Sequence, residues 1–111
     1  MLQASTEVVT VTDDTFADLV LAESRPVVVD FWAEWCPPCL AISRSLAELA
    51  AEFGGRIVVA KLDVDANPVA TRAYQVLAMP TLLFFRAGTV VDGVVGARPK
   101  TFLRERMAAL L

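Results

Sequence analysis

The sequence predicts an α/β fold in which a mixed five-stranded sheet is flanked by four helices. Segments of strand and helix character alternate over the first two thirds of the 111 residues, an order that suits parallel strands joined by crossover helices. The run at residues 27–32 is apolar apart from Asp30, which is typical of a strand covered on both faces, and the run at 56–65 predicts a second buried strand. Two later runs, 81–85 and 89–95, are joined by Arg86-Ala87-Gly88 and predict an antiparallel hairpin at one edge.

The first strand and the first helix have the weakest patterns. Residues 7–11 alternate weakly between polar and apolar side chains and predict a short strand. The Thr-Asp-Asp segment at 12–14 consists of residue types that begin helices. Apolar residues then follow at helical spacing between Phe16 and Val20, which predicts the first helix.

Three further helices have clear starts, ends or apolar faces. Apolar side chains recur on one helical face over residues 42–53, and Gly54-Gly55 ends that pattern. Asn67-Pro68 combines an N-cap residue with proline at the first helical position. Pro99 opens a final helix with four apolar residues on one side: Leu103, Met107, Leu110 and Leu111.

The composition fits one folded domain that spans residues 1–111, and it excludes several functions. Apolar residues make up 56% of the chain, which argues against disorder. The basic residues do not cluster and the net charge is −3, so nucleic acid is not an expected partner. No uninterrupted apolar run reaches about 18 residues, and the first ten residues lack the pattern of a signal peptide. We therefore expect a cytoplasmic protein that does not bind a membrane.

The two cysteines are the focus of the chemistry that remains. The chain has no histidine, which excludes Cys–His and Ser–His nucleophile pairs and removes the imidazole ligands of most metal sites. Both cysteines lie in the segment DFWAEWCPPCLA, between a predicted strand and a predicted helix. If that helix begins near Pro37, neither Pro37 nor Pro38 costs a hydrogen bond. Cys36 and Cys39 are three residues apart and would then share one helical face.

This position at a helix N-terminus predicts reactive thiols. The positive end of a helix favours a thiolate, and a Cys-X-X-Cys motif there lowers the thiol pKa from about 8.5 to between about 3.5 and 7.5. Cys36, at the mouth of the helix, is expected to be the more exposed cysteine and to attack a substrate disulfide. Cys39, one turn further in, would resolve the mixed disulfide.

Three other interpretations of the cysteine pair are less favoured. Free cysteines are often only small buried apolar side chains, but prolines at a helix start are an unusual way to fill a core. A zinc site needs four ligands, which this chain cannot supply alone from two cysteines. A purely structural disulfide across so short a loop would constrain little of the unfolded chain, and the cytosol keeps thiols reduced.

Two charges interrupt the buried strands, and each needs a partner or a function. A charge in a strand covered on both faces is costly unless it is paired or neutralised. Lys61 can extend its long side chain to solvent, whereas Asp30 is harder to accommodate and lies six residues before Cys36. Burial would raise the pKa of the Asp30 carboxyl. We therefore expect Asp30 to accept the proton of Cys39 when Cys39 attacks.

These segments together resemble the thioredoxin family. The resemblance runs from about Val8 to Leu110 and rests on VDFWAEWC-x-PC, followed by VAKLDVDANP, MPTLLFF and VVGA at the intervals that the family shows. It implies the thioredoxin fold and the reduction of protein disulfides by dithiol–disulfide exchange, hence a part in electron transport and cell redox homeostasis. The implied partners are disulfide-containing proteins and a thioredoxin reductase that passes on electrons from NADPH. A redox-active Cys36–Cys39 disulfide, no bound cofactor, no metal and a monomeric protein complete the expectation.

The resemblance also implies roles for residues outside the cysteine pair. Asp30 and Lys61 match the family's buried acid and its neighbouring lysine. Met79-Pro80 matches the site of a cis peptide bond, which would place Met79 backbone groups beside the cysteines, where an extended substrate segment could pair with them. A further set matches the apolar rim on which partners dock: Trp32, Trp35, Gly96 and Ala97.

Three positions depart from the family's usual residues. Pro37-Pro38 replaces Gly-Pro, which removes a backbone N–H and stiffens the loop. These two effects act on different quantities, so the change in redox potential has no predicted sign. Leu40 replaces a common lysine or arginine at the rim, with an effect on partner choice that the sequence does not define. Arg44 replaces a common proline, which predicts a straighter helix.

Two other functions are weighed against disulfide reduction. One is a specialised redox partner in cytochrome maturation or oxidative folding, although such proteins usually carry a signal or an anchor and none is visible. The other is a non-redox scaffold that keeps the thioredoxin fold. The presence of Asp30, both cysteines and Met79-Pro80 argues against a scaffold.

Overall fold

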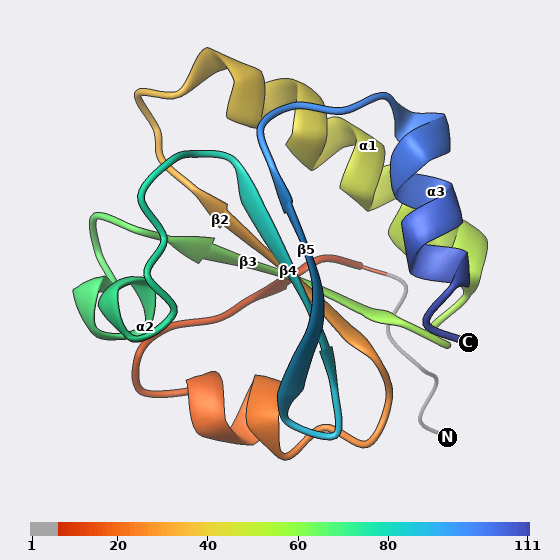
Figure 1. Ribbon diagram of the computed structural model, residues 1–111, viewed down its shortest axis with the longest axis horizontal. Helices are drawn as coiled ribbons and strands as arrows, with labels where there is room; N and C mark the ends of the chain where they lie inside the picture. The colour runs from red at the N-terminus through yellow and green to blue at the C-terminus, as the bar shows by residue number, and fades with distance from the viewer. Residues whose placement is uncertain (1–6) are drawn as a thin grey trace.

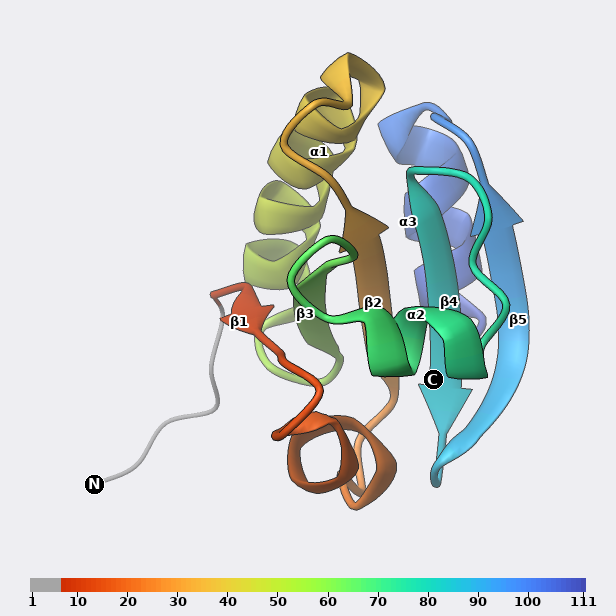
Figure 2. The same cartoon turned by 90° about the vertical axis from the view of Figure 1, so that its left-hand side faces the viewer.

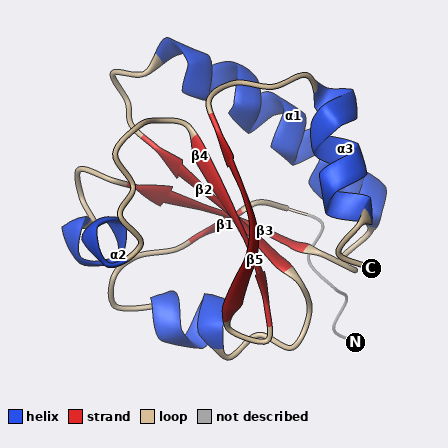
Figure 3. Cartoon of the chain, in the orientation of Figure 1, coloured by secondary structure: helices blue, strands red, loops and turns tan. Residues whose placement is uncertain are grey.

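The computed structural model describes residues 7–111, and within that range strands and helices alternate as the sequence predicts (Figures 1 and 3). The strands are β1 (Val9–Thr10), β2 (Val27–Trp32), β3 (Val58–Asp63), β4 (Thr81–Arg86) and β5 (Thr89–Val95). The helices are η1 (Ala17–Leu21), α1 (Pro37–Phe53), α2 (Pro68–Ala73) and α3 (Lys100–Ala108). Of these, η1 is a single π-helical turn of five residues.

The five strands form one mixed sheet in the order β1-β3-β2-β4-β5. β3 pairs in parallel with both β1 and β2. β4 runs antiparallel to β2 and to β5, so the expected hairpin lies at the edge of the sheet. The α/β fold with a mixed five-stranded sheet and four helical segments is therefore confirmed, and β2 occupies its centre.

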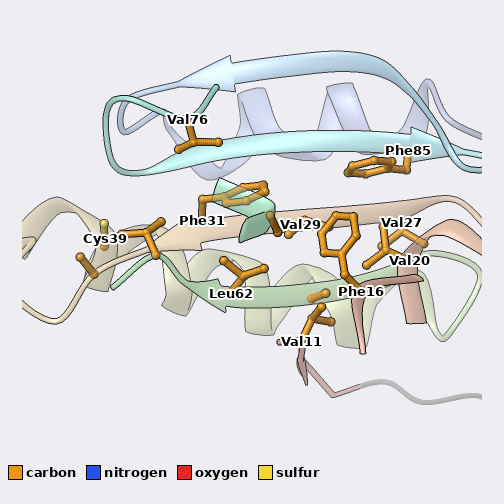
Figure 4. Close-up of a cluster of buried hydrophobic side chains, with 14 of the residues drawn as sticks. Val11, Phe16, Val20, Val27, Val29, Phe31, Cys39, Leu62, Val76 and Phe85 are labelled. Carbon is orange, nitrogen blue, oxygen red and sulfur yellow. The ribbon is translucent and has the colours of Figure 1, made fainter. Parts of the chain in front are cut away.

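Helices cover both faces of the sheet and divide the core in two. α1 and α3 lie on one face, and η1 and α2 lie on the other (Figures 1 and 2). Side chains alternate along β2, so that Val28 packs with α1 and α3, whereas Val27, Val29 and Phe31 pack on the opposite side (Figure 4). Both cores contain large side chains with almost no exposed surface, as expected for a strand that is covered on both faces.

Several local predictions are confirmed. α1 ends at Gly54, which has a φ of 61° and so adopts the left-handed conformation that glycine allows. The turn between β4 and β5 contains Ala87 and Gly88, both with positive φ, which matches the twist of a hairpin. α1 continues through Arg44 as one uninterrupted helix, and its straightness stays a prediction.

No helix within residues 7–111 is both long enough and apolar enough to cross a bilayer.

Other local predictions need correction. β1 has two residues rather than five, because β3 alone pairs with it at the sheet edge. Asn67 occupies the N-cap position of α2, but its side chain makes no capping hydrogen bond. The carboxylate of Asp13 accepts the backbone N–H groups of Val69 and Ala70 instead. Leu111, placed on the buried side of the last helix, is 56% exposed because α3 ends before it.

Candidate active site

The cysteine pair lies where the central strand leads into α1. Cys36 is the N-cap residue of α1, with extended backbone angles, and Pro37 and Pro38 form the first two helical positions. Cys36 and Cys39 are joined by a disulfide, with their Cα atoms 5.4 Å apart. Since prolines fit the first turn of a helix without loss of hydrogen bonds, the local sequence places both cysteines on one helical turn as predicted.

The expected difference in exposure between the two cysteines is small. Cys36 is 4% exposed and Cys39 is 1% exposed, so Cys36 is the more exposed cysteine as expected, but both are buried in the disulfide form. The reason is the neighbouring loop, since the Cys36 sulfur lies 3.6 Å from the carbonyl oxygen of Met79. A disulfide sulfur carries no hydrogen, so this approach is a packing contact in the oxidised protein.

The two prolines limit the donors that face the Cys36 sulfur. Neither Pro37 nor Pro38 has a backbone N–H, and the N–H of Cys39 donates to the carbonyl of Cys36 over 3.1 Å. The first three residues of α1 therefore offer the sulfur no free hydrogen-bond donor. Stabilisation of a thiolate here rests on the dipole of the whole helix rather than on direct N–H contacts.

The loop before β4 forms the second wall of the site. The Met79-Pro80 peptide bond is cis, as predicted. The N–H of Gly96, just beyond β5, donates to the carbonyl of Pro80 over 2.8 Å, which ties the loop to the end of the hairpin. Gly96 has a φ of 89°, a conformation that favours glycine and explains this residue type here.

The predicted rim residues lie at different depths. Trp35 is 63% exposed, and its indole N–H donates to Asp65 over 2.8 Å. Ala97 is exposed as well, whereas Trp32 is half-buried and has the ammonium of Lys61 5.8 Å from its ring centre. The rim therefore consists of exposed Trp35 and Ala97, with Trp32 behind them.

Asp30 is buried on the face of the sheet that α1 covers. It is 1% exposed, and it lies in register with Lys61 on β3 and with Leu82 on β4. One carboxylate oxygen, Oδ1, has no hydrogen-bond partner among the described residues. Burial raises the pKa of Asp30 to about 7, although the Ser43 side chain and the charge of Lys61 act in the opposite direction. A carboxyl group with this pKa can accept a proton at neutral pH.

Two residues of the site were not identified from the sequence. Asp65 fixes the exposed ring of Trp35 from 30 residues away, and no local pattern marks such a pair. Ser43 follows Cys39 by four residues on α1, so the two share a helical face. A small polar residue four positions after buried Cys39 and three before buried Leu46, and hence on the buried face of the helix, is the signal that could have identified it.

The described residues hold no group of three or more histidine, cysteine or acidic side chains with the geometry of a metal site. The arrangement instead provides a dithiol or disulfide pair, a buried carboxyl group and a backbone edge beside them.

Comparison with known proteins supports this chemistry. The thioredoxin family model matches residues 7–109. The chain belongs to the thioredoxin family. It is 50% identical over 105 residues to a thioredoxin from Mycolicibacterium smegmatis, covering 92% of this chain and 94% of that protein. It is also 50% identical over 93 residues to a thioredoxin from Streptomyces clavuligerus, covering 84% of this chain and 86% of that protein.

A third relative carries a second named activity in the same chain. A bifunctional thioredoxin reductase/thioredoxin from Mycobacterium leprae is 46% identical over 93 residues, which cover 84% of this chain and 20% of that protein. The family membership and the Cys36–Cys39 disulfide together make this chain a protein thiol-disulfide oxidoreductase with a redox-active disulfide.

Proposed function

We propose that this thioredoxin-family protein reduces disulfides in other proteins, with Cys36 as the nucleophile and Cys39 as the resolving thiol. The observation that carries the proposal is the Cys36–Cys39 disulfide at the N-terminus of α1, packed against the Met79 carbonyl. The edge of the Met79 segment accepts an extended substrate chain, and Trp35, Gly96 and Ala97 form the surface around it. The whole chain, residues 1–111, acts as one domain and as a monomer.

The reaction proceeds in two exchange steps. The Cys36 thiolate attacks one sulfur of the substrate disulfide, so that a mixed disulfide forms and the other substrate sulfur leaves as a thiolate, which takes a proton from water. Cys39 then transfers its proton to Asp30 and attacks the Cys36 sulfur. The Cys36–Cys39 disulfide forms and the second substrate sulfur leaves, so that two electrons pass to the substrate.

The supply of electrons sets the partner and the compartment. A thioredoxin reductase that uses NADPH restores the dithiol, and the relative that joins both activities in one chain supports this pairing. Net reduction of disulfides requires a compartment that is kept reducing, which makes the cytoplasm the proposed location.

Reduction of insulin by the purified protein tests the assignment of the two thiols. With NADPH and a thioredoxin reductase, we expect repeated turnover by the wild type and none by Cys36→Ser. Cys39→Ser should stop after the first step and form a mixed disulfide through Cys36, visible by mass spectrometry. Repeated turnover by Cys36→Ser would contradict the proposal, and Ser45→Ala on the same helix serves as the control that keeps wild-type turnover.

A further inference from the structure

Two small cavities share Ser43 and Lys61 in their walls. The first has a volume of about 150 Å³ and is also lined by Val8, Asp30, Leu46 and Ala47. The second has a volume of about 220 Å³ and is also lined by Trp32, Cys39 and Leu40. Asp30 therefore lines one cavity and Cys39 lines the other. Each cavity has room for several water molecules.

Ser43 is the uncharged polar group between the acid and the thiol. It lies one helical turn after Cys39 and is half-buried, so its hydroxyl is held near the covered face of the sheet. A hydroxyl both donates and accepts a hydrogen bond, so it can donate to a carboxylate and accept from a thiol or a water. A hydrogen bond from Ser43 lowers the pKa of Asp30, and Oδ1 of the same carboxyl group has no partner among the described residues, so the buried carboxylate can accept a further donor.

The other groups around Asp30 do not offer this exchange of hydrogen bonds. Lys61, from β3, has its ammonium 5.8 Å from the Trp32 ring centre, and an ammonium donates but does not accept. Leu82, from β4, is apolar, as is Val8, which follows Glu7 in the chain and lines the first cavity. From α1, Leu46 and Ala47 are apolar as well. Ser43 is thus the residue that connects both cavities with a neutral donor and acceptor.

We propose that Ser43 is a positioning residue for the resolving step: its hydroxyl donates to the Asp30 carboxylate and connects it with the cavity that Cys39 lines. This inference rests on the proposed role of Asp30 as the base. When Cys39 attacks the mixed disulfide, its proton moves to the Asp30 carboxylate by way of the polar groups beside Ser43. The S–S bond to the substrate breaks, the Cys36–Cys39 bond forms, and the departing substrate thiolate takes up a proton.

The direction in which Ser43 shifts the pKa of Asp30 follows from the ionisation state of the carboxyl group that Ser43 stabilises. A hydroxyl that donates to a carboxylate favours the ionised form, and so it holds the pKa of Asp30 below the value that burial alone would give. Without the hydroxyl, Asp30 stays protonated to higher pH and is a poorer proton acceptor near neutrality.

Two measurements on one set of variants test the inference. NMR titration of the Asp30 carboxyl carbon should show a pKa about one pH unit higher in Ser43→Ala than in the wild type. Stopped-flow release of the second thionitrobenzoate, after reduced protein reacts with the aromatic disulfide DTNB, follows the resolving step. In Ser43→Ala, we expect the acid limb of the pH–rate profile of this step to move to higher pH by the same amount. The rate at pH 6 should then fall about tenfold.

Matched variants separate the effect of losing the hydroxyl from the effect of a substitution in this part of the helix. Ser43→Thr keeps the hydroxyl and should behave as the wild type, and Ser45→Ala makes the same substitution two residues away, outside both cavities. An unchanged Asp30 pKa in Ser43→Ala, or the same defect in Ser43→Thr, would overturn the role of Ser43 while Asp30→Asn still abolishes the acid limb. If Asp30→Asn leaves the limb in place, the base role of Asp30 fails, and the inference fails with it.

Discussion

At the scale of single residues, the ionisation of Asp30 couples the chemistry of the site to stability. Burial raises the Asp30 pKa from its ordinary 3.8 to about 7. Between these pH values the folded protein keeps a proton that the unfolded chain releases, so the free energy of unfolding falls as the pH rises. Above about pH 7 the carboxylate is charged in both states and the full penalty of its burial is present.

Replacement of Asp30 by a neutral side chain should therefore stabilise the protein at alkaline pH. For Asp30→Asn, we expect the free energy of unfolding at pH 8 to exceed that of the wild type by up to about 4 kcal/mol, and the two proteins to differ little near pH 4. Urea unfolding across this pH range measures the difference. Glu34→Gln, which removes an exposed carboxyl group, is the control, and parallel pH curves for Asp30→Asn and the wild type would contradict the prediction.

The residues that the sequence analysis identified are those whose type is improbable in their surroundings. A carboxylate in an apolar strand and two cysteines around two prolines are visible without a structure. Asp65 and Ser43 were not identified because their importance depends on what they contact. The partner of Asp65 is 30 residues away, and the carboxyl group that Ser43 faces belongs to a strand in another layer.

At the scale of elements, α2 depends on a residue that is distant in sequence. α2 has only six residues, so it cannot gain much stability from its own hydrogen bonds. Asp13, in the turn before η1, accepts from Val69 and Ala70, and Asn67 in return accepts from the N–H of Asp13 over 2.8 Å. This reciprocal contact joins the start of α2 to the turn that precedes η1.

Removal of this distant cap should destabilise the protein without altering its chemistry. For Asp13→Ala, we expect a loss of about 1–2 kcal/mol in the free energy of unfolding, the usual value of an N-cap, and unchanged insulin reduction at 25 °C. Urea unfolding at pH 7 measures the loss. Asp14→Ala, a neighbouring exposed position, should leave stability nearly unchanged, and an equal loss in both variants would contradict the assignment of the cap to Asp13.

A helix with a long amphipathic repeat was predicted well. A helix whose start depends on a residue distant in sequence was predicted less well. α1 has four apolar turns and a terminal glycine, so both its existence and its end were predicted. The sequence marked Asp13 as a starting residue for the first helix and Asn67 as the cap of α2. The structure exchanges these roles in part, because an N-cap position can be served by any acceptor that reaches it.

At the scale of the whole molecule, the two cores depend on the same five strands. Leu103 of α3 is fully buried against one face of the sheet, and Phe16 and Phe85 pack against each other on the opposite face, with ring centres 5.8 Å apart. Neither core can form unless the sheet between them is complete. The molecule should consequently unfold as one unit.

A cavity in one core should lower the stability of the whole. For Leu103→Ala, we expect the free energy of unfolding to fall by about 2–5 kcal/mol. Circular dichroism and the fluorescence of Trp32 and Trp35, which precede the cysteine pair in the chain, should report one coincident transition. Leu111→Ala, the same substitution at an exposed position, should have little effect, and separate transitions by the two probes would refute the shared sheet as the unit of unfolding.

The architecture as a whole was predictable because its evidence is spread along the chain. Strands with apolar residues on both faces required cover on both sides, and the short hairpin connection required an antiparallel edge. The sequence did not reveal how deeply the two cysteines are buried. Cys36 is the more exposed cysteine, as expected for the residue that begins a helix, yet the Met79 loop, 43 residues further on, covers its sulfur.

The central place of β2 has a consequence for repeated use of the protein. Sheets fray from their outermost strands, and local opening seldom reaches a strand with ladders on both sides. The segment that carries the disulfide directly follows β2, the central strand of this sheet. The amides of β2 should exchange with deuterium among the slowest in the molecule. Local opening of the edge strands can then recur over many catalytic cycles without separating the two cysteine sulfur atoms.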